Sequence, residues 1–382
     1  MKKIKIGIDG SRNRSGGAKI HLIEIIKNFQ NTKKRIQEVH VWANEELLNE
    51  IPDYHWLFKH KPIKNNSSII KELYWQYFIF PKILKKIGID ILLNTSAVTL
   101  NRFKPNVTMS RDMLSFEKGV IKNSGFSLGR LRLILIKYIQ VMSLKRADSV
   151  IFLTKYASKI LQNFTGKINN YRIINHGVNE RFFIDVKKKV EKKNILRCIY
   201  VSNIDFYKHQ SNVVKALSKF KNNDIELILV GGLGNGYPAL IEEKRLDKTM
   251  KQLGNESNFV KILGHIDNNE IPKLYAQSDI IIFASSCENM PNTLVEGMAT
   301  GLPIASSELG PMKEILEDGG IYFNPFCKKS IYEAVKTLVD NNSLRLKLST
   351  KSYNLSKKFS WKKCSINTFN YLIETYDKNI TK

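Results

Sequence analysis

The feature that most constrains the fold is residues 280–305, where an apolar run, a polar loop, a helical segment and a second apolar run follow one another. The first run, residues 280–283, reads Ile-Ile-Ile-Phe and has the length and β-branched content of a buried parallel strand. Residues 292–300 predict a helix, because a Gly-x-Pro stop follows them. Residues 303–305 begin the next strand. This order predicts an open α/β sheet, whose ligands bind at the carboxyl ends of the strands.

Two glutamates lie within this stretch. Glu288 follows the first strand end, and Glu296 comes eight residues later, near the start of the helix. A carboxylate that faces a ligand accepts hydrogen bonds from two neighbouring hydroxyls, such as those of a ribose or a hexose. Asn292, Thr293 and Leu294 would offer backbone N–H groups at the helix N-terminus, where a phosphate binds readily. Two isolated glutamates are usually solvated surface residues, so the flanking strand and glycines carry the functional interpretation.

The pattern of Glu288 and Glu296, followed by Gly-Met-Ala-x-Gly-x-Pro at 297–303, resembles the signature of the retaining glycosyltransferases of family 4 (glycosyl transferases group 1), which have the GT-B fold. The resemblance implies an α/β protein with two doubly wound Rossmann-like domains facing a central cleft. It implies that Glu288 contacts the donor sugar and that Glu296 binds the ribose. The implied reaction transfers a hexose from a UDP- or GDP-sugar with retention of configuration, without an obligatory metal or another cofactor.

The same resemblance divides the 382 residues, which are enough for two full cores, into domains. Residues 1–177 would form the acceptor-binding domain and residues 178–358 the nucleotide-sugar-binding domain. Residues 359–382 would form a final helix that crosses back to the first domain. A polar, lysine-rich segment at 185–194 would separate the two halves.

Three further residues of the second half belong to the implied donor site. Lys208 follows a strand at 195–201 and matches the lysine that binds the donor diphosphate in the family; its alternative is a surface lysine. Asn203 stands where the family usually has arginine, so a catalytically impaired sugar-binding protein remains an alternative. His265 lies in the segment 260–266, which corresponds to the one that touches the nucleobase.

Candidate residues of the first half follow two predicted strands. Gly16 and Gly17 precede an amphipathic helix at about 18–29, and glycines there let the backbone approach a ligand. In the family this loop closes over the donor phosphates and the acceptor. Arg111 and Asp112 stand where the family often has His-Asp. Arg111 is predicted to hold a phosphate bidentately, and Asp112 to serve as an acceptor-side base or, with equal weight, as a helix N-cap.

The formal net charge is +26, and the first half carries most of it. Residues 1–177 hold 31 Lys and Arg against 12 Asp and Glu, whereas the remaining residues hold 30 against 23. Such a surface is compatible with an anionic membrane, nucleic acid or an acidic acceptor. No RRM, KH or zinc-finger pattern is present, so a nucleic-acid-binding protein is the weaker alternative and we expect no nucleic-acid partner. We expect a saccharide acceptor, lipid-linked, as in the assembly of a bacterial surface polysaccharide.

Residues 130–146 combine apolar and basic side chains at helical spacing, with Leu131, Leu135, Tyr138 and Met142 in one stripe. Such a helix can lie on an anionic membrane, but we expect the stripe to face the core and the charges to face water. The four cysteines are scattered, no run of 18 apolar residues occurs, and the charged N-terminus lacks a signal-peptide core. These features predict a cytoplasmic protein, with peripheral contact to the inner face of the plasma membrane as the open question.

Overall fold

The computed structural model describes residues 2–13, 16–62, 69–117, 128–184, 195–220, 225–234 and 236–381. The chain divides into two compact units: unit 1 comprises Met1–Gly177 and Ser360–Lys382, and unit 2 comprises Val178–Phe359. The expected division after residues 177 and 358 lies at these bounds or one residue from them. The lysine-rich segment at 185–194 lies outside the described residues.

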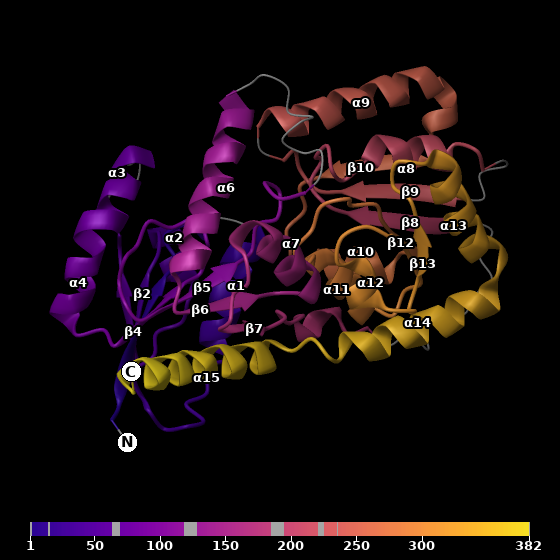
Figure 1. Ribbon diagram of the computed structural model, residues 1–382. Coiled ribbons are helices and arrows are strands. Elements are labelled where there is room, and N and C mark those ends of the chain that lie inside the picture. Colours follow the sequence, from indigo (N-terminus) through magenta and orange to yellow (C-terminus); the bar gives the residue numbers. More distant parts are fainter. Residues whose placement is uncertain are drawn as a thin grey trace. The chain divides into compact units, whose positions relative to one another are not determined.

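Unit 1 is built on a seven-stranded parallel sheet in the order β3-β2-β1-β4-β5-β6-β7 (Figure 1). Its central strands are buried on both faces, which explains their nearly continuous apolar sequences. The strands are β1 (Ile4–Asp9), β2 (Ile36–Trp42), β3 (Leu57–His60), β4 (Ile91–Asn94), β5 (Asn106–Ser110), β6 (Ser149–Phe152) and β7 (Tyr171–Ile173). The helices are α1 (Gly16–Lys27), α2 (Glu45–Glu50), α3 (Ile69–Tyr74), the π-helix η1 (Trp75–Ile79), α4 (Phe80–Ile87), α6 (Leu128–Arg146), α7 (Lys155–Thr165) and α15 (Trp361–Ile380).

The last helix, α15, belongs to unit 1 although it follows unit 2 in the sequence. It contacts α1, β4 and β5, and its long row of buried residues, among them Phe369 and Leu372, explains why it stays there. The chain leaves and re-enters unit 1 at one crowded point. A Cβ on Gly177 would lie only 2.0 Å from the backbone nitrogen of Trp361, so the two segments can pass this closely only because residue 177 is glycine.

The expectation for the apolar stripe of α6 is wrong. Leu131, Leu135 and Tyr138 are 64%, 54% and 62% exposed, whereas Gln140 and Leu144 on the opposite side are buried. The helix therefore packs on unit 1 through its other face and presents the stripe to solvent. The periodicity shows that one face is apolar, but it does not show which face another element covers.

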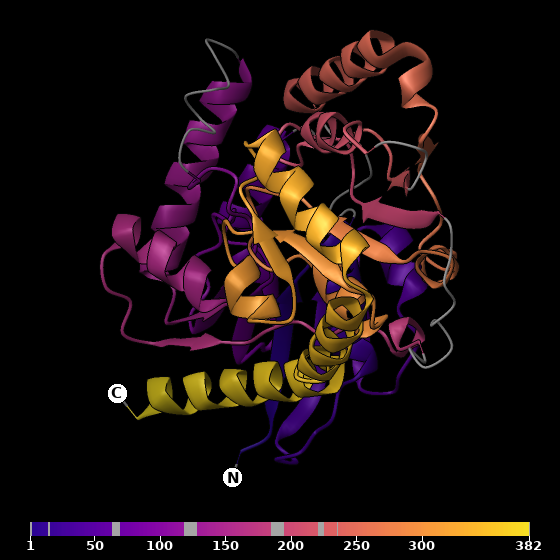
Figure 2. The ribbon, with the colours of Figure 1, turned by 90° about the vertical axis from the view of Figure 1, so that its right-hand side faces the viewer.

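Unit 2 is built on a six-stranded parallel sheet in the order β10-β9-β8-β11-β12-β13. Helices lie along both faces of each sheet (Figure 1 and Figure 2). The strands are β8 (Leu196–Val201), β9 (Ile225–Val230), β10 (Val260–Gly264), β11 (Ile280–Phe283), β12 (Ile304–Ser307) and β13 (Ile321–Phe323). The helices are η2 (Glu180–Phe182), α8 (Gln210–Leu217), α9 (Tyr237–Leu253), η4 (Gly254–Ser257), α10 (Ile271–Ala276), α11 (Asn292–Ala299), α12 (Met312–Leu316), α13 (Lys328–Asp340) and α14 (Asn342–Ser356).

The stretch from which the fold was predicted has the expected structure. It forms the strand β11, a loop, the helix α11 and the strand β12. β11 lies beside β8, with Ile280 opposite Cys198, and the strand order reverses between these two strands. In a doubly wound sheet, the loops that leave the carboxyl ends of such a pair of strands enclose the ligand site. The sequence of unit 2 thus brings the loops after β8 and β11 together.

Candidate functional site

Lys208 and Glu288 meet at the point where the strand order of unit 2 reverses. Lys208 lies in the loop after β8, and its Nζ donates to Oε1 of Glu288 in the loop after β11, 80 residues away. Both side chains are largely buried. Nζ of Lys208 also lies 5.6 Å from the centroid of the Phe283 ring, which adds a cation–π contact. The structure thus brings together the two residues that the sequence assigned to the donor diphosphate and the donor sugar.

The loop that carries Lys208 is fixed by bonds to the neighbouring strand and loop. The Tyr200 hydroxyl donates to the carbonyl oxygen of Lys208 at 2.7 Å. The backbone N–H of Ser286 donates to the carbonyl oxygen of Tyr207 at 2.8 Å. These bonds leave little freedom to the Lys208 backbone, so the ammonium group is placed by the fold before any ligand arrives.

Asn203 and His265 lie in the loops after β8 and β10, two strands that flank β9, at the same edge of the sheet. The Asn203 side chain is exposed, and the backbone carbonyl oxygen of Asn203 accepts a hydrogen bond from Nε2 of Gln210 at 2.8 Å. His265 is exposed directly after β10, and a Cβ on Gly232 would lie 3.4 Å from its own Cβ. Asn203 therefore shares the loop that carries Lys208, whereas His265 lies two strands away from it.

The helix α11 begins at Asn292, where the sequence predicts a helix to start. Pro291 precedes the helix without a side-chain cap, and Val295 is the first residue whose N–H bonds back to a carbonyl oxygen, that of Pro291, at 3.3 Å. The N–H groups of Asn292, Thr293 and Leu294 thus belong to the first turn, which has no intrahelical acceptors. Leu294 buries its side chain completely, so only its backbone N–H is available to an anion.

Glu296 lies one turn further along α11 and is only partly exposed. Burial raises its pKa to about 7, and the guanidinium of Arg181 opposes that shift. Arg181 is itself held by Oδ1 of Asn269. A partly exposed carboxyl group with a raised pKa is a common feature of functional sites, because a purely structural position would favour an uncharged side chain.

We predict that Glu296→Gln stabilises the free protein at pH 8 and changes little at pH 4. The unfolded glutamate titrates near pH 4.3, so unfolding releases a proton between that pH and about 7, and stability falls as the pH rises through this window. Above pH 7 the folded protein bears the full free-energy cost of burying the ionised Glu296 carboxylate. Replacing it with the neutral glutamine should therefore raise the free energy of unfolding by about 1–3 kcal/mol. Calorimetric melting at both pH values checks this; a lower melting point for the variant at pH 8 would contradict it.

The candidate residues of unit 1 form a separate group. Arg111 donates from its two terminal nitrogens to the carbonyl oxygens of Gly17, at 2.6 Å, and Ala18, at 3.1 Å. Burial lowers the pKa of Arg111 to about 10, so it remains a cation. Gly16 and Gly17 open α1 and are exposed. The guanidinium thus ties the glycine loop to β5, and two of the donors that we assigned to a phosphate already have partners.

Asp112 is exposed and accepts a hydrogen bond from the backbone N–H of Leu114 at 2.9 Å. A hydrogen bond of this kind, from a backbone N–H two residues later to the aspartate side chain, is what the N-cap interpretation predicts. It occupies one carboxylate oxygen and leaves the other to an acceptor. Both interpretations of Asp112 therefore stay predictions.

Sequence reasoning missed Asp205, Arg181 and Tyr275. Burial raises the pKa of Asp205 to about 6, opposed by the N–H of Phe206 and by Lys208, so this carboxyl belongs to the same group as the Lys208–Glu288 pair. Tyr275 donates to the carbonyl oxygen of Thr293 at 3.3 Å and supports the start of α11. Arg181 lies far from Glu296 in sequence, and no motif marks it.

Comparisons with known proteins identify a family that matches part of the chain and relatives that match most of it. Residues 180–355 match the family Glycosyl transferases group 1. A relative in Campylobacter jejuni, N-acetylgalactosamine-N,N'-diacetylbacillosaminyl-diphospho-undecaprenol 4-alpha-N-acetylgalactosaminyltransferase, is 23% identical over 355 residues, 88% of this chain and 91% of that protein.

Solved structures show the fold of the whole chain. Sucrose-phosphate synthase from Thermosynechococcus elongatus has a TM-score of 0.78 and 16% identity, and the match covers 98% of this chain and 100% of that one. HepE of Anabaena in complex with UDP-glucose has a TM-score of 0.72 and 19% identity, with 97% and 100% covered. The chain therefore has the GT-B fold, and its residues 180–355 match the glycosyl transferases group 1.

Proposed function

We propose that this protein is a retaining glycosyltransferase that moves a hexose from a UDP- or GDP-sugar to a lipid-linked saccharide in the assembly of a bacterial surface polysaccharide. The observation that carries the proposal is the Lys208–Glu288 pair, which lies where the strand order of unit 2 reverses, beside the N-terminus of α11. A cation and free N–H groups suit a diphosphate, and carboxylates suit the hydroxyls of a sugar and a ribose.

In this proposal the chain's own groups neutralise the leaving diphosphate, without an obligatory metal. Lys208 and the N–H groups of residues 292–294 would contact the phosphates, where negative charge develops as the glycosidic bond breaks. Glu288 would bind the transferred sugar, and Glu296 the ribose. The HepE structure with UDP-glucose supports a nucleotide-sugar donor for this fold.

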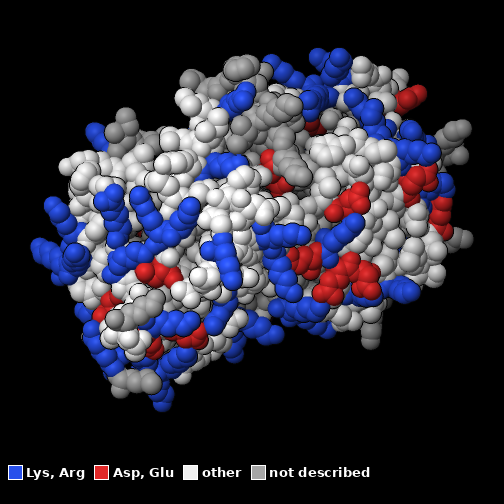
Figure 3. Space-filling view, in the orientation of Figure 1, with Lys and Arg blue, Asp and Glu red and all other residues white. Residues whose placement is uncertain are grey.

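The acceptor follows from a relative and from the charge of the chain. The name of the Campylobacter relative describes transfer to a saccharide on diphospho-undecaprenol, a lipid. Residues 1–177 carry 31 basic against 12 acidic residues, and Lys and Arg cover much of the face of unit 1 drawn in Figure 3. Such a surface attracts anionic lipids, and a lipid-linked acceptor would be anchored in the same membrane.

The exposed stripe of α6 gives this surface an apolar component. Leu131, Ile134, Leu135 and Tyr138 are all exposed on one face of the helix, with Arg132 beside them. A second exposed group, Tyr74, Phe78 and Ile79, lies on α3 and η1. Among the described residues every helix is too short or too polar to cross a bilayer. We therefore propose that α6 lies in the membrane interface as an amphipathic helix.

The first test is thermal stabilisation of the purified protein by UDP and by GDP, each with EDTA. A ligand at a hundred times its Kd stabilises the folded state by about 2.7 kcal/mol and so raises the melting temperature. We expect this rise in melting temperature with only one of the two nucleotides. The rise should vanish in Glu296→Ala and persist in Glu308→Ala, whose carboxylate is exposed and pairs with Lys313. No shift with either nucleotide would overturn the proposed donor site.

A further inference from the structure

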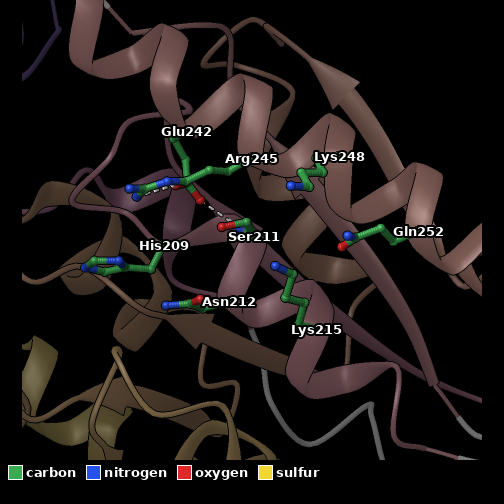
Figure 4. A pocket seen from close by; sticks show the side chains of 8 residues that line it. All are labelled: His209, Ser211, Asn212, Lys215, Glu242, Arg245, Lys248 and Gln252. Atoms are coloured by element: carbon green, nitrogen blue, oxygen red, sulfur yellow. Dashed lines mark hydrogen bonds and ion pairs between the residues drawn. The ribbon is translucent and has the colours of Figure 1, made fainter.

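A hollow in unit 2 lies between α8 and α9. Its volume is about 380 Å³, within the range of small-molecule sites. Three basic residues line it: Lys215 from α8, and Arg245 and Lys248 from α9. Figure 4 shows the amino groups of Lys215 and Lys248 pointing into the space between the two helices.

The single acidic residue of the hollow is already bound to protein groups. Glu242 is 1% exposed, and its Oε1 accepts a hydrogen bond from the backbone N–H of Ser211 at 2.8 Å. Its other oxygen lies 3.8 Å from Nη1 of Arg245. The carboxylate thus ties α9 to the start of α8 and offsets part of the charge of Arg245 (Figure 4).

The two lysines have no such partner. Neither Lys215 nor Lys248 has a carboxylate within ion-pair distance in the part of the chain that the structure describes. His209 also lines the hollow, but burial lowers its pKa to about 4, so it adds no charge near neutral pH. Three cations and one carboxylate leave two positive charges facing one small cavity, which is the complement of a phosphate dianion.

We propose that this hollow binds the phosphate group of a small phosphorylated molecule, as a site separate from the donor site. Lys215 and Lys248 would bind the phosphate oxygens as point charges. Asn212 lies beside them and is held by the carbonyl oxygen of Pro325 at 3.0 Å, so its amide is oriented before the ligand arrives. The volume has room for a sugar ring beside the phosphate.

The site is linked to the donor site through His209. This residue directly follows Lys208, and its Nε2 lies 2.8 Å from Oγ of Ser286, in the loop that carries Glu288. His209 also has a positive φ of 54°, a conformation that few side chains adopt freely. A ligand that contacts His209 therefore touches the segment that places Lys208.

The test is calorimetric titration with inorganic phosphate at pH 8 and constant ionic strength. The proteins are the wild type, Lys215→Gln/Lys248→Gln, Lys208→Gln and Lys244→Gln/Lys251→Gln. The last pair lies on α9, outside this hollow, and removes the same charge. We expect the first double variant to raise the Kd at least about tenfold, because two charged contacts are lost, whereas the other two variants keep the wild-type value for this site.

Equal loss in both double variants would show only a general field of positive charge, and loss in Lys208→Gln alone would place the phosphate in the donor site; either result overturns the proposal. Two further ligands identify the source of the phosphate. If glucose 6-phosphate binds more tightly than inorganic phosphate, and its binding depends on Lys215 and Lys248 in the same way, the ligand is a sugar phosphate. Binding to phosphatidic acid vesicles with that dependence, and none to the free phosphates, indicates a lipid headgroup.

Discussion

Lys208→Gln is expected to lower kcat for sugar transfer by about 10²–10³, because one preorganised cation at a developing charge contributes roughly that much. The glutamine keeps a polar side chain, one bond shorter than lysine, but cannot neutralise the diphosphate. Binding of the sugar donor should weaken less than catalysis, since the charge on the leaving group grows towards the transition state. The rates are measured as release of UDP or GDP from a sugar donor that carries the nucleotide found to stabilise the protein.

The ion pair with Glu288 supplies the control for this variant. Lys208→Gln leaves Glu288 without its partner in a largely buried place, and the loss of stability from an unpaired carboxylate would lower activity by itself. Lys208→Gln/Glu288→Gln removes both charges and should recover the melting point but not the rate. Recovery of the rate in the double variant would show that Lys208 serves only to neutralise Glu288. Lys273→Gln, in an exposed pair with Glu270, should behave as wild type.

Sequence patterns predicted the parts of unit 2 that depend on local chemistry. The run of four apolar residues gave β11 its bounds, and the Gly-x-Pro stop placed the end of α11 within one residue. Gly297 shows why the small residue is needed there, since a Cβ would lie 2.8 Å from Cδ1 of Ile281 on the strand beneath. The resemblance then supplied what spacing cannot, namely the assignment of Lys208 and Glu288, 80 residues apart, to one donor site.

Contacts between distant segments explain what sequence could not predict. Arg111 was expected to point to a phosphate, but its terminal nitrogens bond to Gly17 and Ala18, which lie more than 90 residues earlier. Arg181 comes close to Glu296 only because η2 folds beside α11. Burial at such places depends on which elements pack together, and no residue pattern within one helix or loop records it.

The α6 stripe is the case in which a pattern was recognised and its direction mistaken, and it gives the second large prediction. Leu131→Ser/Leu135→Ser/Tyr138→Ser should reduce binding to vesicles containing phosphatidylglycerol by about a hundredfold. Burial of one such side chain contributes about 1.5–3 kcal/mol, and an interface buries each only in part. The three side chains are exposed, so the melting point should stay close to that of the wild type. Vesicle flotation measures the binding.

Two comparisons separate the apolar stripe from the charge around it. Leu240→Ser/Leu346→Ser removes exposed leucines from α9 and α14 of unit 2 and should leave vesicle binding unchanged. Raising the salt concentration should weaken the contribution of the basic residues to vesicle binding by the wild type, because salt screens charges. The contribution of the α6 stripe should remain, because it depends on buried apolar area. If the triple variant binds as well as the wild type in low salt and in high salt, α6 does not enter the membrane interface. Its exposed stripe would then need another partner.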